Sequence, residues 1–496
     1  MKLFENPIFI TQCRLVRRTG VLAAAFIAGL VGFCLLLGFA VSLHVAIIMK
    51  GGAGEIGKFY YGWIVGLEIL VLVLGGFSRI ARALADDRKA GLWDSNRLSP
   101  LRPADILLGY WLGPALREFY MAVVLAGFGL LIVLCARLPL TLWLGTQLLI
   151  ASTALFFGLL GVLAGMVYQG SQGILMIVLS LFSFPFTAFA PSRMISNLLL
   201  PTYGMIHLFQ SGESAPGPGP NWLTPAQIFG LPLHPVLVSV ALQALLGAFL
   251  WRALVRKTAH PFEPLLLRRE AVGLFSLLLV VQQGLLWDIW QGKYPALTLA
   301  GARYQQEMPL LIMVHGATLF LGLVLLGLAS PLPERVRVES LRLGFKTVGA
   351  VFSRSAVSLA LALSVIAGGL FATHFIFSLP GNWLILLSVF LNLTTLFLTF
   401  ALLLEFCRLR HGRRALGFIG LWLFALCALP FILAAVFVNA GFAQLSLLAP
   451  GFYALAESGD TNWALLYGTL LAHAGVVLLL YLGWHRQWQR LLTQAA

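Results

Sequence analysis

The sequence predicts an all-α, polytopic membrane protein with about 12 transmembrane helices in two six-helix halves. Three observations predict this fold class. Of the 496 residues, 60% are hydrophobic and 10% are charged, the apolar residues form long continuous runs, and short basic clusters separate these runs. A soluble domain is typically about 45–50% apolar and about 25% charged. The composition therefore excludes a soluble enzyme, and it excludes a disordered chain, which would be poor in apolar residues.

The apolar runs have the length of membrane-spanning helices, because about 20 apolar residues cross about 30 Å of hydrocarbon. A membrane β-barrel would show shorter, alternating segments. The first six runs lie near residues 20–46, 60–78, 112–136, 141–167, 173–191 and 233–254. The second six lie near residues 272–290, 308–329, 356–378, 382–404, 415–439 and 464–484.

The basic residues predict the orientation of these spans. With the N-terminus in the cytoplasm, 27 of the 33 Lys and Arg residues fall on the cytoplasmic side. The six external ones are Lys50, Lys58, Arg137, Arg193, Lys293 and Arg303. Such an excess is typical of cytoplasmic segments, and a missed span would reverse every later loop. We therefore expect both termini in the cytoplasm and no nucleic acid among the partners.

The chain shows no pattern that predicts a catalytic, cofactor or metal site. None of the five cysteines belongs to a CxxC pair, so neither a disulfide framework nor a zinc site is indicated. No GxSxG or HExxH motif occurs. The first apolar run, from Val21 to about Met49, exceeds the roughly 7–15 residues of a signal-peptide core, and we expect it to be a retained span.

The most informative segment is the cytoplasmic stretch between the second and third runs, residues 78–111. It contains the mixed charge cluster Asp86, Asp87, Arg88 and Lys89. Four adjacent charges are strongly hydrated, and we expect all of them to lie in water. The stretch has the composition of a stiff cytoplasmic elbow against which a soluble partner could push, although an ordinary solvated loop is the alternative.

The residues after this cluster predict the shape of the elbow. Gly91 permits a tight turn. A short interfacial helix follows, with Leu92, Trp93 and Leu98 expected on one face. Two prolines break it, and the second, Pro103, favours a new helix start.

Residues 81–113, ARALADDRKAGLWDSNRLSPLRPADILLGYWLG, resemble the signature of type 2 ABC permeases. That family shows an acidic residue, a basic pair, Gly-Thr, a leucine-rich stretch, Thr-Pro-Leu-Ser and Glu-Ile-x-x-Gly-Lys. The residues that match are Asp87, Arg88, Gly91, Asp94, Ser99, Pro100, Leu101, Asp105, Ile106 and Gly109. Leu92, Arg102 and Tyr110 depart from the family pattern. The opening Asn6-Pro7-Ile8, followed by arginines, is also similar.

The resemblance implies that residues 1–260 form a six-span permease domain with an interfacial N-terminal helix and a cytoplasmic coupling elbow. Residues 261–496 would form a second six-span region, with a divergent repeat as one interpretation. The residues implied in coupling to an ATPase are Asp86, Asp87, Arg88, Lys89, Gly91, Asp94, Ser99, Pro100 and Asp105. A separate subunit would hydrolyse ATP, and the chain would export an unidentified substrate across a bacterial inner membrane. It could pair with a second copy or act as a pseudo-dimer.

Glu68 lies in the middle of the second run, and it is the one acidic residue that we expect in the middle of a span. Because a buried carboxylate is costly in a membrane, it is a candidate for a substrate or coupling role. A packing hydrogen bond or a protonated spectator is the plainer interpretation. Glu68 also keeps an alternative function open, a secondary carrier driven by an ion gradient, in which it would bind a proton or sodium. A membrane scaffold, or an enzyme of lipid-linked substrates, ranks below both.

Overall fold

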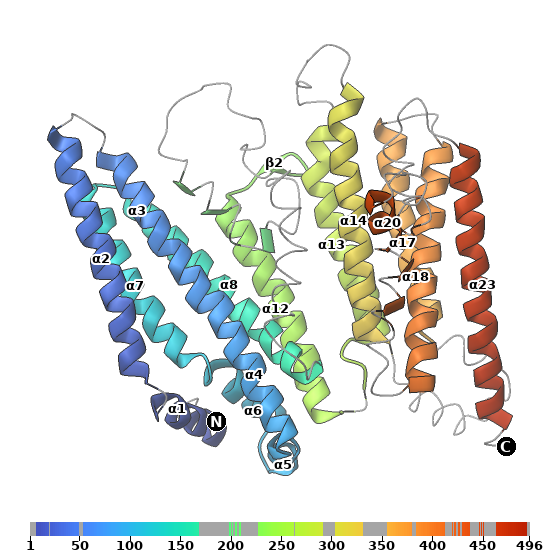
Figure 1. Cartoon of the computed structure of the whole chain (residues 1–496), viewed down its shortest axis with the longest axis horizontal. Helices are drawn as coiled ribbons and strands as arrows, with labels where there is room; N and C mark the ends of the chain where they lie inside the picture. The colour runs from blue at the N-terminus through green and yellow to red at the C-terminus, as the bar shows by residue number, and fades with distance from the viewer. Residues whose placement is uncertain are drawn as a thin grey trace. The chain divides into compact units, whose positions relative to one another are not determined.

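The computed structural model describes the residues 6–18, 20–48, 53–167, 227–261, 263–290, 303–330, 355–378, 383–411 and 463–493, with shorter pieces within 198–209 and 419–450. This part of the chain is helical almost throughout (Figure 1). Its sheet is a single pair of two-residue strands, β1 (Gln227–Ile228) and β2 (Leu231–Pro232). The prediction of a helical fold is confirmed for these residues.

Nine helices in the described part of the chain are long and apolar enough to cross a membrane. They cover Val21–Val45, Gly54–Lys89, Leu116–Cys135, Leu140–Met166, Pro235–Ala259, Arg268–Trp287, Ala356–Thr373, Leu384–Arg410 and Leu466–Arg490. Each coincides with an apolar run of the sequence. The architecture is therefore that of a multi-pass membrane protein.

Three expected spans are not among these helices. The run near 308–329 is helical, with a shorter apolar stretch, Val314–Ala329. The run near 173–191 and about half of the run near 415–439 lie outside the described residues. The count of twelve spans and the cytoplasmic position of the termini stay predictions.

The chain divides into two compact units. Unit 1 comprises residues 1–226 and 232–261, and unit 2 comprises residues 227–231 and 262–496. The helices of unit 1 are α1 (Pro7–Arg18), α2 (Val21–Ile48), α3 (Ala53–Glu68), η2 (Ile69–Gly75), α4 (Gly76–Lys89), α5 (Leu92–Leu98), α6 (Pro103–Leu112), α7 (Leu116–Cys135), α8 (Leu140–Val167) and α12 (Pro235–Ala259). Those of unit 2 are α13 (Arg268–Trp290), α14 (Arg303–Ala329), α17 (Ala356–Ser378), α18 (Trp383–His411), α20 (Leu429–Val436) and α23 (Trp463–Thr493).

The core of unit 1 forms around α3, which packs against α2 and α7. Tyr61 and Ile64 of α3 are fully buried, and the Tyr61 hydroxyl hydrogen-bonds the Thr146 hydroxyl of α8. The outer helices instead expose apolar side chains. Leu22 and Phe26 of α2 are 86% and 73% exposed, as expected of a helix that faces lipid.

One uninterrupted helix runs from Ala53 to Lys89 through α3, η2 and α4. The sequence predicted a span near 60–78 followed by a charged loop from Ser78. That boundary was wrong, because the helix continues eleven residues past Ser78 to Lys89. In this way the second span reaches the elbow as a continuous helix.

The π-helix η2 sets which side chains of this long helix share a face. In an uninterrupted α-helix of 3.6 residues per turn, Tyr61 and Leu84 would lie about 140° apart around the axis. Both are fully buried, and both approach α8, Tyr61 at Thr146 and Leu84 beside Gly165. A π-helix bonds i to i+5 and so has more residues per turn. It therefore absorbs most of this rotation and keeps Tyr61 and Leu84 on the same side of the long helix.

Glycines on α8 allow α4 to pack very closely. A Cβ atom at Gly161 would lie 2.9 Å from the carbonyl oxygen of Phe77, and one at Gly165 would lie 2.8 Å from that of Ala81. Because the obstructing atoms are backbone, no side-chain movement could make room for a Cβ atom. Small residues at helix contacts are the usual way for membrane helices to approach closely.

Unit 2 is built around α18, which packs against α17 and α23. Its Glu405 is 4% exposed and accepts hydrogen bonds from Trp484 Nε1, at 2.5 Å, and from the backbone amide of Ala356. Arg268 and Arg408 place positive charge close to the same carboxylate. The carboxylate thus joins one end of α13, α17, α18 and α23.

Candidate functional site

The elbow, residues 86–105, consists of the end of α4, the short helix α5 and the start of α6, joined by two sharp turns (Figure 1). Gly91 forms the first turn with a φ of 76°, a left-handed conformation that glycine adopts without steric cost. The second turn follows Ser99, whose hydroxyl donates to the carbonyl of Asn96 at 2.5 Å. Pro103 then occupies the first turn of α6. The turn at Gly91 and the helix start at Pro103 are as predicted.

A polar cluster around Asp87 joins four helices. Its Oδ2 atom accepts hydrogen bonds from the Tyr110 hydroxyl of α6 at 2.6 Å and from Gln12 Nε2 of α1 at 3.4 Å. The Tyr110 hydroxyl accepts from Asn96 Nδ2 of α5 at 3.1 Å. The Trp93 ring packs edge-on against the Tyr110 ring, with centroids 5.5 Å apart. Asp87 therefore lies inside the elbow and holds α1, α4, α5 and α6 together.

The protonation state of Tyr110 fits this arrangement. Burial raises the pKa of the Tyr110 hydroxyl, and its hydrogen bond to Asp87 and the negative charge of Asp87 raise it further. The phenol therefore stays protonated at neutral pH and can donate to the carboxylate. A hydrogen bond between a neutral donor and an ionised acceptor is stronger than a neutral pair.

The N-terminal helix α1 is attached to α6 by Asn6 and by a glycine contact. Asn6 Oδ1 accepts from the backbone amide of Ile8 at 3.0 Å, as an N-cap does. Its Nδ2 atom donates to the carbonyl of Asp105 at 2.6 Å. A Cβ atom at Gly109 of α6 would lie 2.8 Å from Ile8 Cγ2, so only glycine permits this approach. The opening Asn-Pro-Ile and residue 105 are thereby brought together.

Two arginines of the elbow cap the C-termini of two membrane helices. Arg88 Nη1 donates to the carbonyl of Gly165 at 3.1 Å and to that of Met166, at the end of α8. Arg97 Nε donates to the carbonyl of Thr258 at 2.9 Å, at the end of α12. The last carbonyls of a helix have no partner within it, and positive charge is favourable there. A displacement of the elbow would therefore pull directly on α8 and α12.

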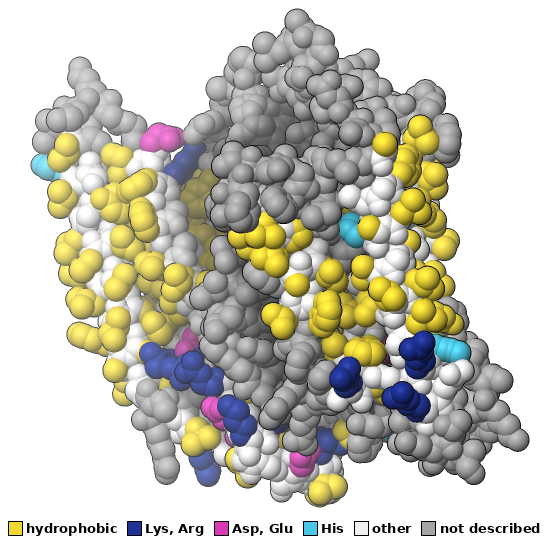
Figure 2. Space-filling model, turned by 45° about the vertical axis from the view of Figure 1, so that its right-hand side comes forward, with side chains coloured by type: hydrophobic (Ala, Val, Ile, Leu, Met, Phe, Trp, Pro, Cys, Tyr) yellow, Lys and Arg dark blue, Asp and Glu magenta, His cyan; other side chains and the backbone are white. Residues whose placement is uncertain are grey.

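The outer surface of the elbow carries Asp86, Lys89, Leu92, Asp94 and Leu98. Leu92 and Leu98 are 53% and 89% exposed, and all three charged residues are exposed. Figure 2 shows helices that carry hydrophobic side chains along their length and charged side chains near both ends. Exposed leucines among mixed charges can contact a soluble partner.

The structure corrects two expectations about these residues. All four charges of the 86–89 cluster were expected in water, but Asp87 and Arg88 are half-buried because they bond to neighbouring helices. Trp93 was expected beside Leu92 and Leu98, but it is 7% exposed. Successive helix positions differ by about 100°, so the three residues spread around α5 and cannot share one face.

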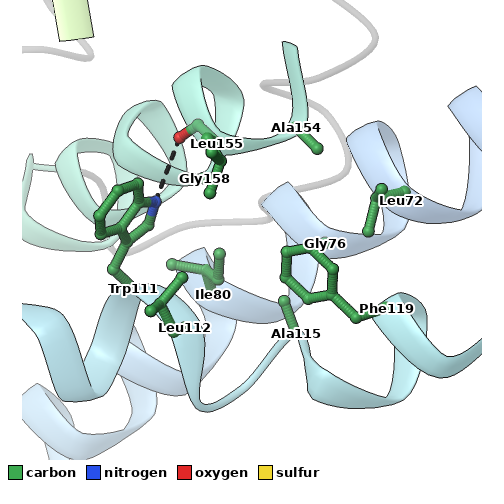
Figure 3. A pocket seen from close by; sticks show the side chains of 10 residues that line it. All are labelled: Leu72, Gly76, Ile80, Trp111, Leu112, Ala115, Phe119, Ala154, Leu155 and Gly158. Carbon is green, nitrogen blue, oxygen red and sulfur yellow. Dashed lines mark hydrogen bonds between the residues drawn. The ribbon is translucent and has the colours of Figure 1, made fainter. Parts of the chain in front are cut away.

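A small pocket lies where α6 meets the membrane helices (Figure 3). It is shallow and partly open to the outside. Its lining is Leu72, Gly76, Ile80, Trp111, Leu112, Ala115, Phe119, Ala154, Leu155 and Gly158. Trp111 Nε1 already donates to the carbonyl of Leu155 at 3.1 Å, so the pocket presents apolar surface and no charged group.

Glu68 lies away from the elbow, at the junction of α3 and η2, and is 1% exposed. Gln147 Nε2 of α8 donates to its Oε2 atom at 2.8 Å. Among the described residues Oε1 has no hydrogen-bond partner. Glu68 was expected to be the one acid in the middle of a span. Two other acids are also buried, but they lie near helix ends: Glu118, in the first turn of α7, is 6% exposed, and Glu405, near the end of α18, is 4% exposed.

Several residues that hold the elbow together were not predicted from the sequence. Gln12, Asn96 and Arg97 were not singled out, and Tyr110 was noted as a departure from a family pattern. Tyr110 carries a usable signal, because a tyrosine hydroxyl in the apolar second half of a helix usually finds a hydrogen-bond partner when it is buried. Gln12 carries none, since its partner Asp87 is distant in sequence.

The described residues contain no group of three or more His, Cys, Asp or Glu side chains that could hold a metal ion. Scans against protein-family models and searches of curated proteins and of solved structures found no match for this chain. The site is therefore interpreted from its own geometry and from the sequence signature of the elbow.

Proposed function

We propose that this chain is the membrane-spanning permease subunit of an ATP-driven ABC transporter, and that it exports a substrate still to be identified. A separate ATPase subunit hydrolyses the ATP, and the chain itself carries out no chemistry. The bilayer is the bacterial inner membrane, with both termini in the cytoplasm. The resemblance of residues 81–113 to type 2 ABC permeases supports this proposal.

The observation that carries the proposal is the division of the elbow into an inner and an outer side. The inner side is bonded to α1, α8 and α12 through Asp87, Arg88 and Arg97. The outer side exposes Leu92 and Leu98 between charged residues. A partner that binds the outer side can therefore displace three helices at once, and a coupling element requires this property.

The ATPase partner is expected to contact the outer surface of the elbow with an apolar socket for Leu98 and charges complementary to Asp86, Lys89 and Asp94. In ABC transporters ATP binding brings two ATPase subunits together. Unit 1 supplies one elbow, so either a second copy of the chain or the second unit has to provide the other contact.

The proposal is tested by purifying the tagged chain from membranes of its native cell and measuring ATP hydrolysis in the purified complex. The Leu98→Glu variant places a charge at the centre of the proposed contact. We expect it to lower the affinity for the ATPase at least about tenfold, or about 1.4 kcal/mol. The matched control is Leu233→Glu, because Leu233 is 41% exposed and precedes the opposite end of α12.

The outcomes separate the proposal from a secondary carrier. Co-purified ATPase activity that Leu98→Glu removes and Leu233→Glu retains supports it. The proposal is refuted if the wild-type chain purifies without a P-loop ATPase and transports in liposomes under an imposed ion gradient alone. That result would favour a secondary carrier.

A further inference from the structure

The long helix from Ala53 to Lys89 contains a buried acid for which the proposed function provides no role. Glu68 is the last residue of α3 and directly precedes η2. With a rise of 1.5 Å per residue, it lies about 22 Å along the axis from Ala53 and about 32 Å from Lys89. That places it inside the hydrocarbon layer, which is about 30 Å thick, and away from both helix ends.

The immediate surroundings of Glu68 are polar but uncharged. Gln147 Nε2 donates to Oε2 at 2.8 Å. Tyr61 lies on the same face of α3, close enough to feel the charge of Glu68, and its hydroxyl bonds Thr146. Tyr61 is the titratable group that faces Glu68 from its own helix, while α8 contributes the amide and the hydroxyl. None of these three groups carries a positive charge that could neutralise an ionised Glu68 carboxylate.

The other buried carboxylates in the described part of the chain lie close to positively charged side chains, and Glu68 does not. Glu118 of α7 forms an ion pair with Arg79, with Nε and Oε1 3.3 Å apart. Glu405 accepts two hydrogen bonds and has Arg268 and Arg408 close by. Glu68 and Glu118 each have one carboxyl oxygen without a hydrogen-bond partner among the described residues. Glu68 differs in that its bonded partner is the neutral amide of Gln147 and not a positively charged group. A buried charge without compensation is avoided in proteins by neutralising the group.

We propose that Glu68 is a proton-binding site inside the membrane, carrying a proton on its unpartnered carboxyl oxygen and exchanging it reversibly. Binding one proton converts the carboxylate to the neutral acid and releases nothing else. Gln147 keeps its hydrogen bond to Oε2 in both states, because each state retains an acceptor there.

The position of the site gives the proton a structural consequence. Glu68 directly precedes the π-helix η2, and η2 sets how α3 and α4 are turned relative to each other. The far end of η2 reaches the second buried acid, since a Cβ atom at Gly75 would lie 3.3 Å from Glu118 Cγ. Protonation or deprotonation of Glu68 therefore changes the charge at one end of η2, the π-helix that connects α3 in the membrane core to α4 and the elbow.

Infrared spectroscopy of the purified chain in lipid nanodiscs tests this without the substrate or the ATPase. A neutral carboxylic acid has a carbonyl stretch separate from that of a carboxylate, and it shifts in D₂O because its proton exchanges. We expect the wild-type protein at neutral pH to show this band and Glu68→Gln to lose it. The band should decline as the pH is raised and return when it is lowered.

Glu118→Gln is the matched control, because Glu118 is a buried acid at the other end of the same π-helix. This variant should leave the carbonyl band unchanged. If Glu68→Gln does not fold, Glu68→Asp keeps an acid with a shorter side chain and should displace the band. The proposal is overturned if wild type and Glu68→Gln have the same spectrum in this region, or if Glu118→Gln removes the band. A band that does not change with pH while the protein stays folded also overturns it.

Discussion

Removing the Tyr110 hydroxyl should weaken the attachment of the elbow to unit 1 without altering its outer surface. Tyr110→Phe deletes the 2.6 Å bond to Asp87 and the 3.1 Å bond from Asn96. A hydrogen bond to a charged group contributes about 1.5–3 kcal/mol net. We expect the free energy of unfolding to fall by this amount, with the upper end favoured because the ring is fully buried.

A double-mutant cycle isolates the contribution of the bond itself. Unfolding in mixed detergent micelles, followed by circular dichroism, gives the free energies of the wild type, Tyr110→Phe, Asp87→Asn and the double variant. We expect a coupling energy of about 1–3 kcal/mol, within the range found for residues in one hydrogen-bond network. Tyr120→Phe is the control, since Tyr120 is 55% exposed, and it should change the free energy by less than about 0.5 kcal/mol.

The result that would refute this reasoning is additivity. If the effects of the two single variants sum to that of the double variant within about 0.5 kcal/mol, the residues do not interact energetically. The inner side of the elbow would then be held by other contacts. Loss of stability in Tyr120→Phe as large as that in Tyr110→Phe would likewise show that the assay does not report this bond.

Two further predictions concern the long helix. Gly161→Ala should lower the free energy of unfolding by about 1–3 kcal/mol, because its Cβ would lie 2.9 Å from the Phe77 carbonyl oxygen. The control Gly127→Ala, where a Cβ would meet nothing within 4 Å, should leave the free energy of unfolding unchanged or raise it. If both variants lose the same free energy of unfolding, the close packing of α4 on α8 is contradicted. Deleting Leu70 should let η2 return to α-helix with Tyr61 and Leu84 still within about 40° of each other. Deleting Arg82 instead turns the end of α4 by about 100°. The Leu70 deletion should therefore give the more thermostable protein, and equal melting temperatures would contradict the role assigned to the π-helix.

The part of the fold that could be predicted from the sequence is the part determined by local chemistry. Long apolar runs identify helices because a bilayer leaves no other way to satisfy the backbone. Gly91 and Pro103 identify the turns because glycine tolerates positive φ and proline suits the first helical turn. None of these inferences needs knowledge of a residue far away in the sequence.

The internal bonds of the elbow could not be predicted in this way, because their partners are remote. Asp87 bonds Gln12, 75 residues earlier, and Arg88 bonds the carbonyl of Gly165, 77 residues later. Arg97 reaches Thr258 across 161 residues. Nothing in the amino-acid sequence alone connects these positions.

The four charged residues 86–89 look equivalent in the sequence, but in a helix they lie on different sides and differ in exposure. Once α4 is known to extend to Lys89, successive residues are turned by about 100°, so Asp86 and Lys89 share one side and Asp87 and Arg88 the other. The first pair is exposed and the second is half-buried. Reversing both aspartates together would therefore combine a change at the outer surface with the loss of an internal bond. Asp86→Lys alone changes the surface available to a partner, and Asp87→Asn alone changes the connection that transmits its movement.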